Sequence, residues 1–286
     1  MNAPNIAVYA GGPLGPSEIS QNLTATQQAG WTTIILGLFH IGRPDIKGQN
    51  YGDIIFNDSM TISQGKYLMD PSWPGNVAAL KQAGHSSVTK IYASIGGGVG
   101  VQDFQTIQKI YQSNGNSFSG TMLETNLQLL CKTFPAIDGI DMDCEDNYDQ
   151  VSFVAFCELL IGLGFDITFC PYASWEMSFW TGSLAQIDKQ HPGAVKWWNL
   201  QCYDGGSGND PKDWAAAITQ AIPAFSTDQF IVPGDWTEDS PSAVTSLFST
   251  FAGEACLGGG FIWNMDGILS GSSKMADYVN AIKSAL

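Results

Sequence analysis

The chain has 286 residues and carries 27 Asp and Glu against 12 Lys and Arg, so its net charge of -15 would repel nucleic-acid phosphates and anionic membrane surfaces. Its composition, 44% hydrophobic and 14% charged, is typical of a globular chain with a large core and excludes wholesale disorder. No apolar stretch approaches the roughly 18 to 20 residues that a membrane span needs. We therefore expect no nucleic-acid and no membrane partner.

Short apolar segments rich in β-branched and aromatic residues alternate with amphipathic segments along the whole chain. Eight of the first kind predict strands, at 5–12, 33–40, 90–98, 137–145, 166–174, 197–206, 230–236 and 259–267. Six of the second kind predict helices, at 17–30, 74–84, 121–134, 152–164, 213–225 and 242–253. This alternation favours a (β/α)8 TIM barrel, as a single catalytic domain over residues 1–286, rather than a doubly wound sheet.

Two of the connections between predicted strands are long. Residues 41–89 include a hairpin-like segment at 53–63, and residues 99–120 are polar and rich in Gly and Ser, so we expect both to wall a groove. The connection at 237–258 has room for little more than one helix.

Cysteine and histidine spacing gives no sign of a metal or redox centre. The six cysteines are spread singly, mostly through apolar segments, which predicts free core thiols rather than disulfides. No CxxC pair is present, and the three histidines lack the spacing of metal ligands. We expect no metal and no cofactor.

Acidic and apolar residues alternate at the fourth predicted strand, where the acids are Asp141, Asp143 and Glu145, with Asp138 just before them. Period-two alternation sends these three carboxylates to one face of the strand, which is the inside of a barrel. Burial and mutual repulsion would raise their pKa values at a cost in stability, which indicates function. A solvated acidic face is disfavoured by the interleaved Ile and Met. A calcium loop is disfavoured because Asp146 stands where that loop needs Gly.

The segment Asp138 to Glu145, DGIDMDCE, resembles the DxxDxDxE signature of family 18 glycoside hydrolases, the chitinases and endo-β-N-acetylglucosaminidases. Three further segments match the family in the same order along the chain. The first, Ser94 to Gly97, resembles the SxGG strand, in which Ser hydrogen-bonds an acid of the motif. Gln201 to Asp204 resembles the sixth-strand motif, although it combines the Gln and Asp of two family variants. Trp263 ends the last strand, where the family keeps a tryptophan.

The resemblance implies endo-hydrolysis of β-1,4-linked N-acetylglucosamine polymers with retention, without metal or cofactor. Glu145 would protonate the leaving oxygen, while Asp143 would orient the substrate acetamide and share a proton with Asp141. Tyr203 would donate to the acetamide oxygen, and Trp263 would carry the sugar ring. The resemblance gives Gln201 and Asp204 substrate-binding roles, and Asp138 and Ser94 supporting ones. The insertion domain of many chitinases has no room in this chain.

Several aromatic residues that follow predicted strands are candidate sugar platforms, because aromatic faces stack on sugar rings. They are Tyr9, Tyr172, Trp175 and Trp236. His40 also ends a strand and is either a substrate contact or a solvated loop residue.

Two other functions stay open. An endo-β-N-acetylglucosaminidase acting on N-glycan cores would use the same residues, and a chitinase-like protein that only binds sugar is disfavoured by the presence of Glu145. The expected partner is chitin or its oligosaccharides, bound by a monomer. No signal peptide is visible at the N-terminus. The resemblance suggests an extracellular protein, and a cytoplasmic one stays open.

Overall fold

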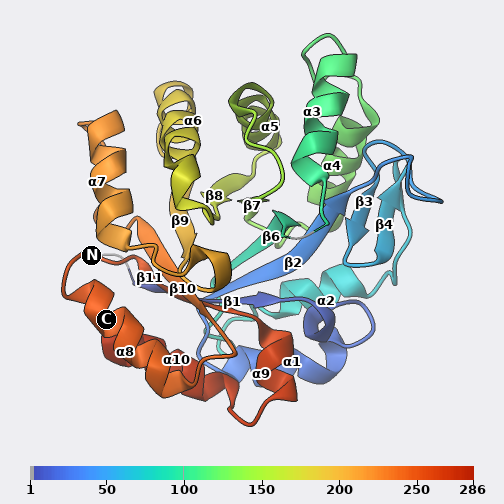
Figure 1. The fold of residues 1–286 in the computed structure, drawn as a ribbon. Coiled ribbons are helices and arrows are strands. Elements are labelled where there is room, and N and C mark those ends of the chain that lie inside the picture. The colour runs from blue at the N-terminus through green and yellow to red at the C-terminus, as the bar shows by residue number, and fades with distance from the viewer. Residues whose placement is uncertain (1–2, 99) are drawn as a thin grey trace.

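The centre of the computed structural model, which describes residues 3–98 and 100–286, is a closed ring of parallel strands (Figure 1). In chain order the ring strands are β1 (Asn5–Ala10), β2 (Thr33–Ile41), β6 (Lys90–Gly97), β7 (Gly139–Cys144), β8 (Asp166–Phe169), β9 (Val195–Gln201), β10 (Ile231–Trp236) and β11 (Gly259–Trp263). Each strand pairs with the next, and β1 pairs with both β11 and β2, which closes the ring. The predicted (β/α)8 barrel and its eight strands are confirmed, although several strands end earlier than predicted.

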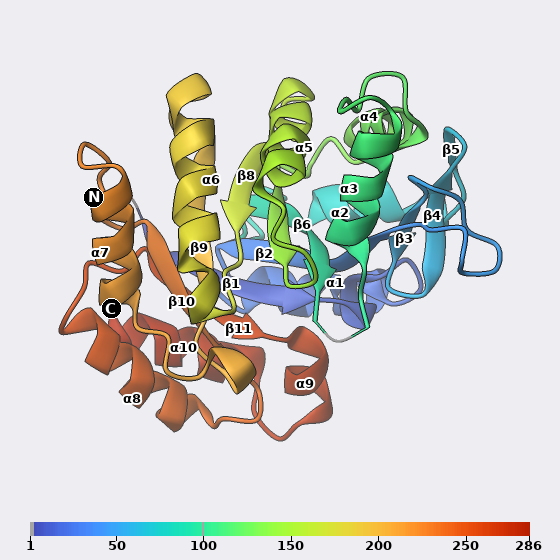
Figure 2. The ribbon, with the colours of Figure 1, turned by 45° about the horizontal axis from the view of Figure 1, so that its top comes forward.

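Helices follow the strands and surround the ring (Figures 1 and 2). They are α1 (Ile19–Gln28), α2 (Trp73–Ala79), α3 (Asp103–Ser113), α4 (Met122–Thr133), α5 (Gln150–Gly162), α6 (Met177–Gln190), α7 (Pro211–Ala221), α8 (Pro241–Ala252), α9 (Met265–Ser270) and α10 (Met275–Ala285). Several begin at a side-chain cap, where an oxygen accepts an unpaired N–H of the first turn. Asp149, for example, accepts from the N–H of Ser152 at 3.0 Å and begins α5 directly after the acidic strand.

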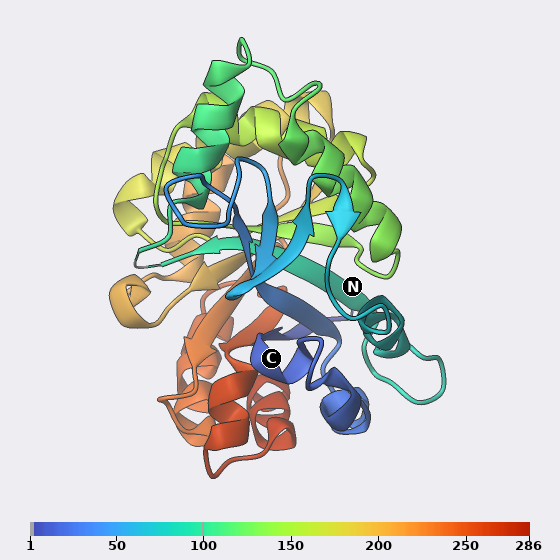
Figure 3. The ribbon, with the colours of Figure 1, turned by 90° about the vertical axis from the view of Figure 1, so that its right-hand side faces the viewer.

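The connection between β2 and β6 carries an antiparallel extension of the sheet. It consists of β3 (Ile54–Phe56), β4 (Ser59–Ser63) and β5 (Lys66–Tyr67), with β3 paired to the end of β2. Figure 3 shows these strands in front of the barrel. Asn57 at the first turn has a positive φ of 49° and accepts the N–H of Leu38 at 3.0 Å, which ties the turn to β2. The predicted hairpin is confirmed.

The polar connection at 99–120 holds the helix α3, which the sequence analysis did not predict. Phe104, Ile107 and Ile110 recur every three residues and are buried, and α3 packs against α5 and β6. These positions have helical spacing in the sequence, but the connection as a whole is polar and rich in Gly and Ser, and this composition led to its interpretation as a loop. Among the described residues of this connection, those at 100–103, which end at the first residue of α3, line a cavity.

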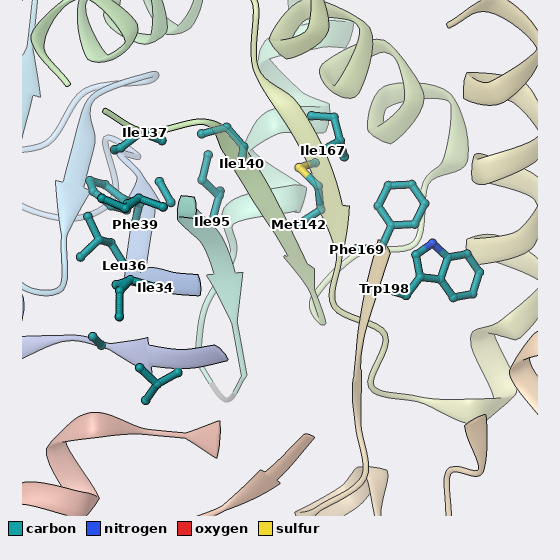
Figure 4. Packing of buried hydrophobic residues seen from close by; sticks show 14 of the residues in the cluster. Ile34, Leu36, Phe39, Ile95, Ile137, Ile140, Met142, Ile167, Phe169 and Trp198 are labelled. Atoms are coloured by element: carbon teal, nitrogen blue, oxygen red, sulfur yellow. The ribbon is translucent and has the colours of Figure 1, made fainter. Parts of the chain in front are cut away.

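Alternate residues of the barrel strands belong to two separate cores. Those pointing outward pack under the helices, as Figure 4 shows for Ile140 and Met142 of β7 beside Ile95 and Ile167 of the neighbouring strands. Those pointing inward fill the barrel with aromatic residues, among them Tyr9, Tyr92, Trp197, Tyr203 and Phe261. The inward positions of β7 are left to Asp141 and Asp143.

Three further expectations from the sequence concern the cysteines, the connection at 237–258 and membrane-spanning helices. All six cysteines are free thiols, four of them buried. Between β10 and β11 the chain forms α8 and short loops. Within residues 3–98 and 100–286, no helix is both long enough and apolar enough to cross a membrane.

Candidate active site

The three acids predicted to point inward lie at successive depths of one strand. Asp141 and Asp143 on β7 are buried, whereas Glu145, the first residue after the strand, is only partly buried and lines a cavity. The carboxyl ends of all barrel strands meet on this face, which is where enzymes of this fold place their chemistry. Asp143 and Glu145 therefore both reach the cavity, and Asp141 lies beneath them.

Asp141 is held by four hydrogen-bond donors from four other strands. Its Oδ2 accepts from Tyr9 Oη and Ser94 Oγ, both at 2.8 Å, and its Oδ1 accepts from Thr168 Oγ1 at 2.6 Å and Asn199 Nδ2 at 2.9 Å. Burial raises the pKa of Asp141, and these hydrogen bonds oppose that shift by favouring the carboxylate. Asp141 is thus fixed in place at the floor of the site.

The carboxyl groups of Asp143 and Glu145 are joined by the side chain of Gln201. The Nε2 of Gln201 donates to Asp143 Oδ1 at 3.1 Å and to Glu145 Oε1 at 3.0 Å, and the two carboxyls hydrogen-bond to each other. Burial, followed by the charges of Glu145 and Asp141, raises the pKa of Asp143 well above its usual range. Burial also raises the pKa of Glu145. Both carboxyls therefore favour their protonated forms more than free carboxyls do. The proton sharing between Asp143 and Asp141 that the resemblance implies stays a prediction.

The glycines of the Ser94 to Gly97 segment are required by the close approach of β6 to β7. Gly96 and Gly97 have φ values of 117° and 115°, a region that residues with a side chain rarely occupy. A Cβ at Gly96 would also overlap the carbonyl oxygen of Asp143, and one at Gly97 would press on the Leu38 side chain. These two glycines thus allow the acidic strand and the wall of the cavity to take their positions.

The candidate catalytic cavity, at Glu145, has a volume of about 200 Å³ and aromatic walls. Its lining residues are Leu38, Gly97, Gly98, Asp143, Glu145, Tyr172, Gln201, Tyr203, Asp204, Trp236 and Trp263. Tyr203 stacks on Trp236 with ring centroids 5.9 Å apart and 23° between the planes. Half-buried indoles beside carboxyl groups make a site suited to a sugar, which presents both apolar faces and hydroxyl groups.

Two further cavities continue from the catalytic one. A cavity of about 350 Å³ shares Leu38 and Trp263 with it and is also lined by Asn57 and Asp266. A third, of about 580 Å³, shares Asn57 with the second and is lined by His40. Shared lining residues thus place the three cavities next to one another in a row, called the groove below.

The structure brings most of the predicted site residues together, but not all. Asp138 lies apart from the other acids. Because it is an odd number of positions from Asp141, its side chain points out of the barrel, where it pairs with Lys81 Nζ at 2.6 Å. Tyr9 lies in the barrel and reaches the second cavity, not the catalytic one. His40 Nδ1 pairs with Asp103 Oδ2 at 2.8 Å in the third cavity.

Three residues of the site escaped the sequence analysis: Thr168, Asn199 and Cys170. The first two are the donors to Asp141 Oδ1, and the Cys170 thiol accepts from Tyr9 Oη at 3.1 Å and contacts Asp143. Thr168 and Asn199 are polar residues inside apolar strands at inward positions, a signal that could have revealed them. Cys170 carries no such signal, because a lone cysteine in an apolar segment is typical of any core.

Among residues 3–98 and 100–286, no three His, Cys, Asp or Glu side chains are grouped so that they could hold a metal ion. The carboxyl groups of the site instead hydrogen-bond to neutral donors and to each other.

Comparisons in sequence find no relative: no protein-family model and no curated protein matches the chain. Solved structures do match. The catalytic domain of a family 18 chitinase from the fern Peteris ryukyuensis superposes with a TM-score of 0.62 at 20% identity, over 98% of each chain. Active domain 2 of a thermostable chitinase from Pyrococcus furiosus, with catalytic-site mutations and in complex with chito-oligosaccharides, gives 0.58 at 11% identity, over 99% of this chain and 95% of that one. A chitinase-like lectin from tamarind gives 0.53 at 14% identity, over 98% of this chain and 99% of that one. The chain therefore has the (β/α)8 fold of family 18 chitinase catalytic domains.

Proposed function

We propose that the protein is a chitinase-type glycoside hydrolase that cleaves β-1,4 bonds within chains of N-acetylglucosamine, with retention of configuration. One observation carries the proposal: Gln201 holds Asp143 and Glu145 side by side at a cavity that Trp263 lines. Burial raises the pKa of Glu145, which favours the protonated form that a proton donor to the leaving oxygen needs. The same fold in chitinases, one of them in complex with chito-oligosaccharides, supports this substrate class.

The arrangement of Asp143 and Glu145 argues against the usual mechanism with two opposed carboxyls. That mechanism needs them on either side of the sugar, about 5 Å apart for retention or about 6.5 to 9.5 Å apart for inversion. Here Asp143 lies on β7 and Glu145 follows the end of that strand, two residues on, and the two carboxyls hydrogen-bond to each other. Asp143 therefore cannot attack the face of the sugar opposite Glu145. A nucleophile from the substrate itself, the acetamide oxygen, suits this geometry.

The reaction then takes two steps, each with its proton accounted for. The acetamide oxygen bonds to the anomeric carbon while the glycosidic bond breaks, and the leaving oxygen takes the proton of Glu145. Asp143 accepts the acetamide N–H and stabilises the oxazolinium cation, while Tyr203 donates to the acetamide oxygen to orient it. Glu145, now a carboxylate, removes a proton from the water that attacks the anomeric carbon, which opens the oxazoline ring with net retention.

Product analysis on two substrates separates the candidate activities. We expect chitohexaose to be cut internally, and a high-mannose glycopeptide with an intact N-glycan core to survive. Cleavage of the glycopeptide alone would assign the protein as an endo-β-N-acetylglucosaminidase. Tight binding of chitohexaose with no cleavage would instead make it a lectin, which is the description of the structurally similar tamarind protein.

Chitosan tests the mechanism independently of the substrate class. A unit with a free amine lacks the oxygen that closes the oxazolinium ring, so fully deacetylated chitosan should resist cleavage. Partly acetylated chitosan should give new reducing ends that are N-acetylglucosamine, and a cyclic thiazoline mimic should inhibit. Frequent glucosamine at the new reducing ends, or a sugar adduct trapped on Asp143, would refute the substrate-assisted mechanism.

A further inference from the structure

A tryptophan at the rim of the barrel is almost fully exposed although it lies on the catalytic face. Trp175 is 73% exposed, in the short 3-10 helix Ser174–Glu176 that follows β8. It comes three residues after Tyr172, which lines the catalytic cavity, and it lines none of the three cavities. Most of its indole surface is thus in water, an arrangement that costs free energy in the isolated molecule.

The loop that carries Trp175 is held in place from both sides. Asn209 Nδ2 donates to the carbonyl oxygen of Tyr172 at 2.8 Å, and the N–H of Glu176 donates to the carbonyl oxygen of Ala173 at 3.0 Å. Gly205 packs so closely that a Cβ there would overlap the Tyr172 hydroxyl. A ring on such a loop is preorganised, so a ligand that stacks on it does not have to order the backbone.

The barrel topology places Trp175 opposite the second cavity. That cavity is lined by residues that end or follow β1 and β11 and by Leu38 of β2, so it is centred on β1. Counted round the ring from β1, β8 is the fifth of the eight strands and lies across the barrel from β1. The groove thus enters the catalytic cavity from the β1 side, and Trp175 stands beyond its far side.

The position of Glu145 decides which part of the substrate lies near Trp175. In the proposed function the cleaved sugar rests over Trp263, and because Trp263 also lines the second cavity, the sugar chain would continue there. The leaving group would then lie on the side of Glu145, which protonates it, where Tyr172 and Asp204 also line the cavity. From this side, the next exposed aromatic surface along β8 is Trp175.

We infer that Trp175 is a platform on which a pyranose ring of the leaving-group chain stacks, beyond the catalytic cavity. This assignment rests on the proposed function and extends it, because it makes the enzyme prefer substrates that continue for several units past the cleaved bond. Stacking on one exposed indole contributes to binding of long substrates and nothing to the protonation step.

The test compares Trp175→Ala and Trp175→Phe with the wild type on two substrates. Chitohexaose extends past the cleaved bond, whereas 4-methylumbelliferyl di-N-acetylchitobioside has a leaving group that ends there. For Trp175→Ala we expect kcat/KM on chitohexaose to fall about tenfold, mainly through KM, with less than about a twofold change on the aryl substrate. Trp175→Phe should recover most of the loss. Tyr51→Ala is the matched control, because Tyr51 is 47% exposed and lines none of the cavities.

The possible results distinguish a failure of the Trp175 platform from a failure of the proposed function. Equal losses on both substrates, or no loss on chitohexaose, would overturn the platform while leaving the hydrolase intact. A wild-type protein that cleaves neither substrate would reject the proposed function. In that case calorimetric titration with chitohexaose still tests whether Trp175 contributes to sugar binding. Weaker binding by the Trp175→Ala variant supports the platform, and unchanged binding overturns it.

Discussion

Replacing Glu145 with Gln tests the central residue, because the amide keeps the shape of the carboxyl but can neither give nor take the required proton. Its oxygen can still accept from Gln201 Nε2, which donates to Glu145 at 3.0 Å, and its NH2 group can donate to Asp143. The fold should therefore be unchanged. General acid–base catalysis contributes about 10² to 10⁴ in rate, and Glu145 acts in both steps, so we expect kcat to fall about 10³-fold or more, which is about 4 kcal/mol of barrier.

The same substitution should alter stability with a defined dependence on pH. Burial raises the pKa of Glu145 in the folded protein, so the folded state binds its proton more tightly than the unfolded chain does. The wild-type carboxyl thus costs stability above its unfolded pKa of about 4.3, and this cost grows until pH exceeds the folded pKa. Glu145→Gln should have a higher Tm than the wild type at pH 7, and the difference should vanish below about pH 4.

The assay pairs initial rates on chitohexaose with calorimetric melting from pH 4 to pH 8. Glu158→Gln is the matched control, since Glu158 lies on α5, accepts from Gln190 Nε2 at 2.7 Å and lines none of the cavities. A Glu145→Gln variant with near-normal turnover would remove Glu145 from its role. A lower Tm at pH 7 would show that the carboxylate stabilises the site and refute the reasoning from burial.

Two further predictions concern the walls of the site. The charge of Asp204 raises the pKa of Glu145, so Asp204→Asn should lower that pKa and move the basic limb of the kcat/KM profile to lower pH; an unmoved limb would contradict the coupling. Gly96→Ala should destabilise the fold by about 3 kcal/mol or more, seen as a fall in Tm, because the positive φ and the overlap with Asp143 both oppose a Cβ. Gly162→Ala, in a helix with open space around it, is the control and should be neutral or slightly stabilising.

Local patterns in the sequence were enough for the barrel and for the direction of its acids. Period-two alternation in 138–145 predicted that Asp141 and Asp143 point inward while Met142 packs outward, and the two separate cores have that arrangement. Such patterns work because a strand exposes its two faces alternately whatever its neighbours are. Helix α3 was missed although Phe104, Ile107 and Ile110 have helical spacing, because the polar, Gly- and Ser-rich composition of 99–120 indicated a loop.

The partners of those acids were decided only by the tertiary structure. Thr168 and Asn199 reach Asp141, and Gln201 joins Asp143 to Glu145, because β7, β8 and β9 are paired at a particular register round the barrel. Register depends on how the whole ring closes, and no single strand contains that information. The exposure of Trp175 and its place across the barrel from β1 depend on ring closure in the same way. The sequence by itself thus determines which carboxyls face the interior, and closure of the ring determines which groups hold them and which residues line the cavity beside them.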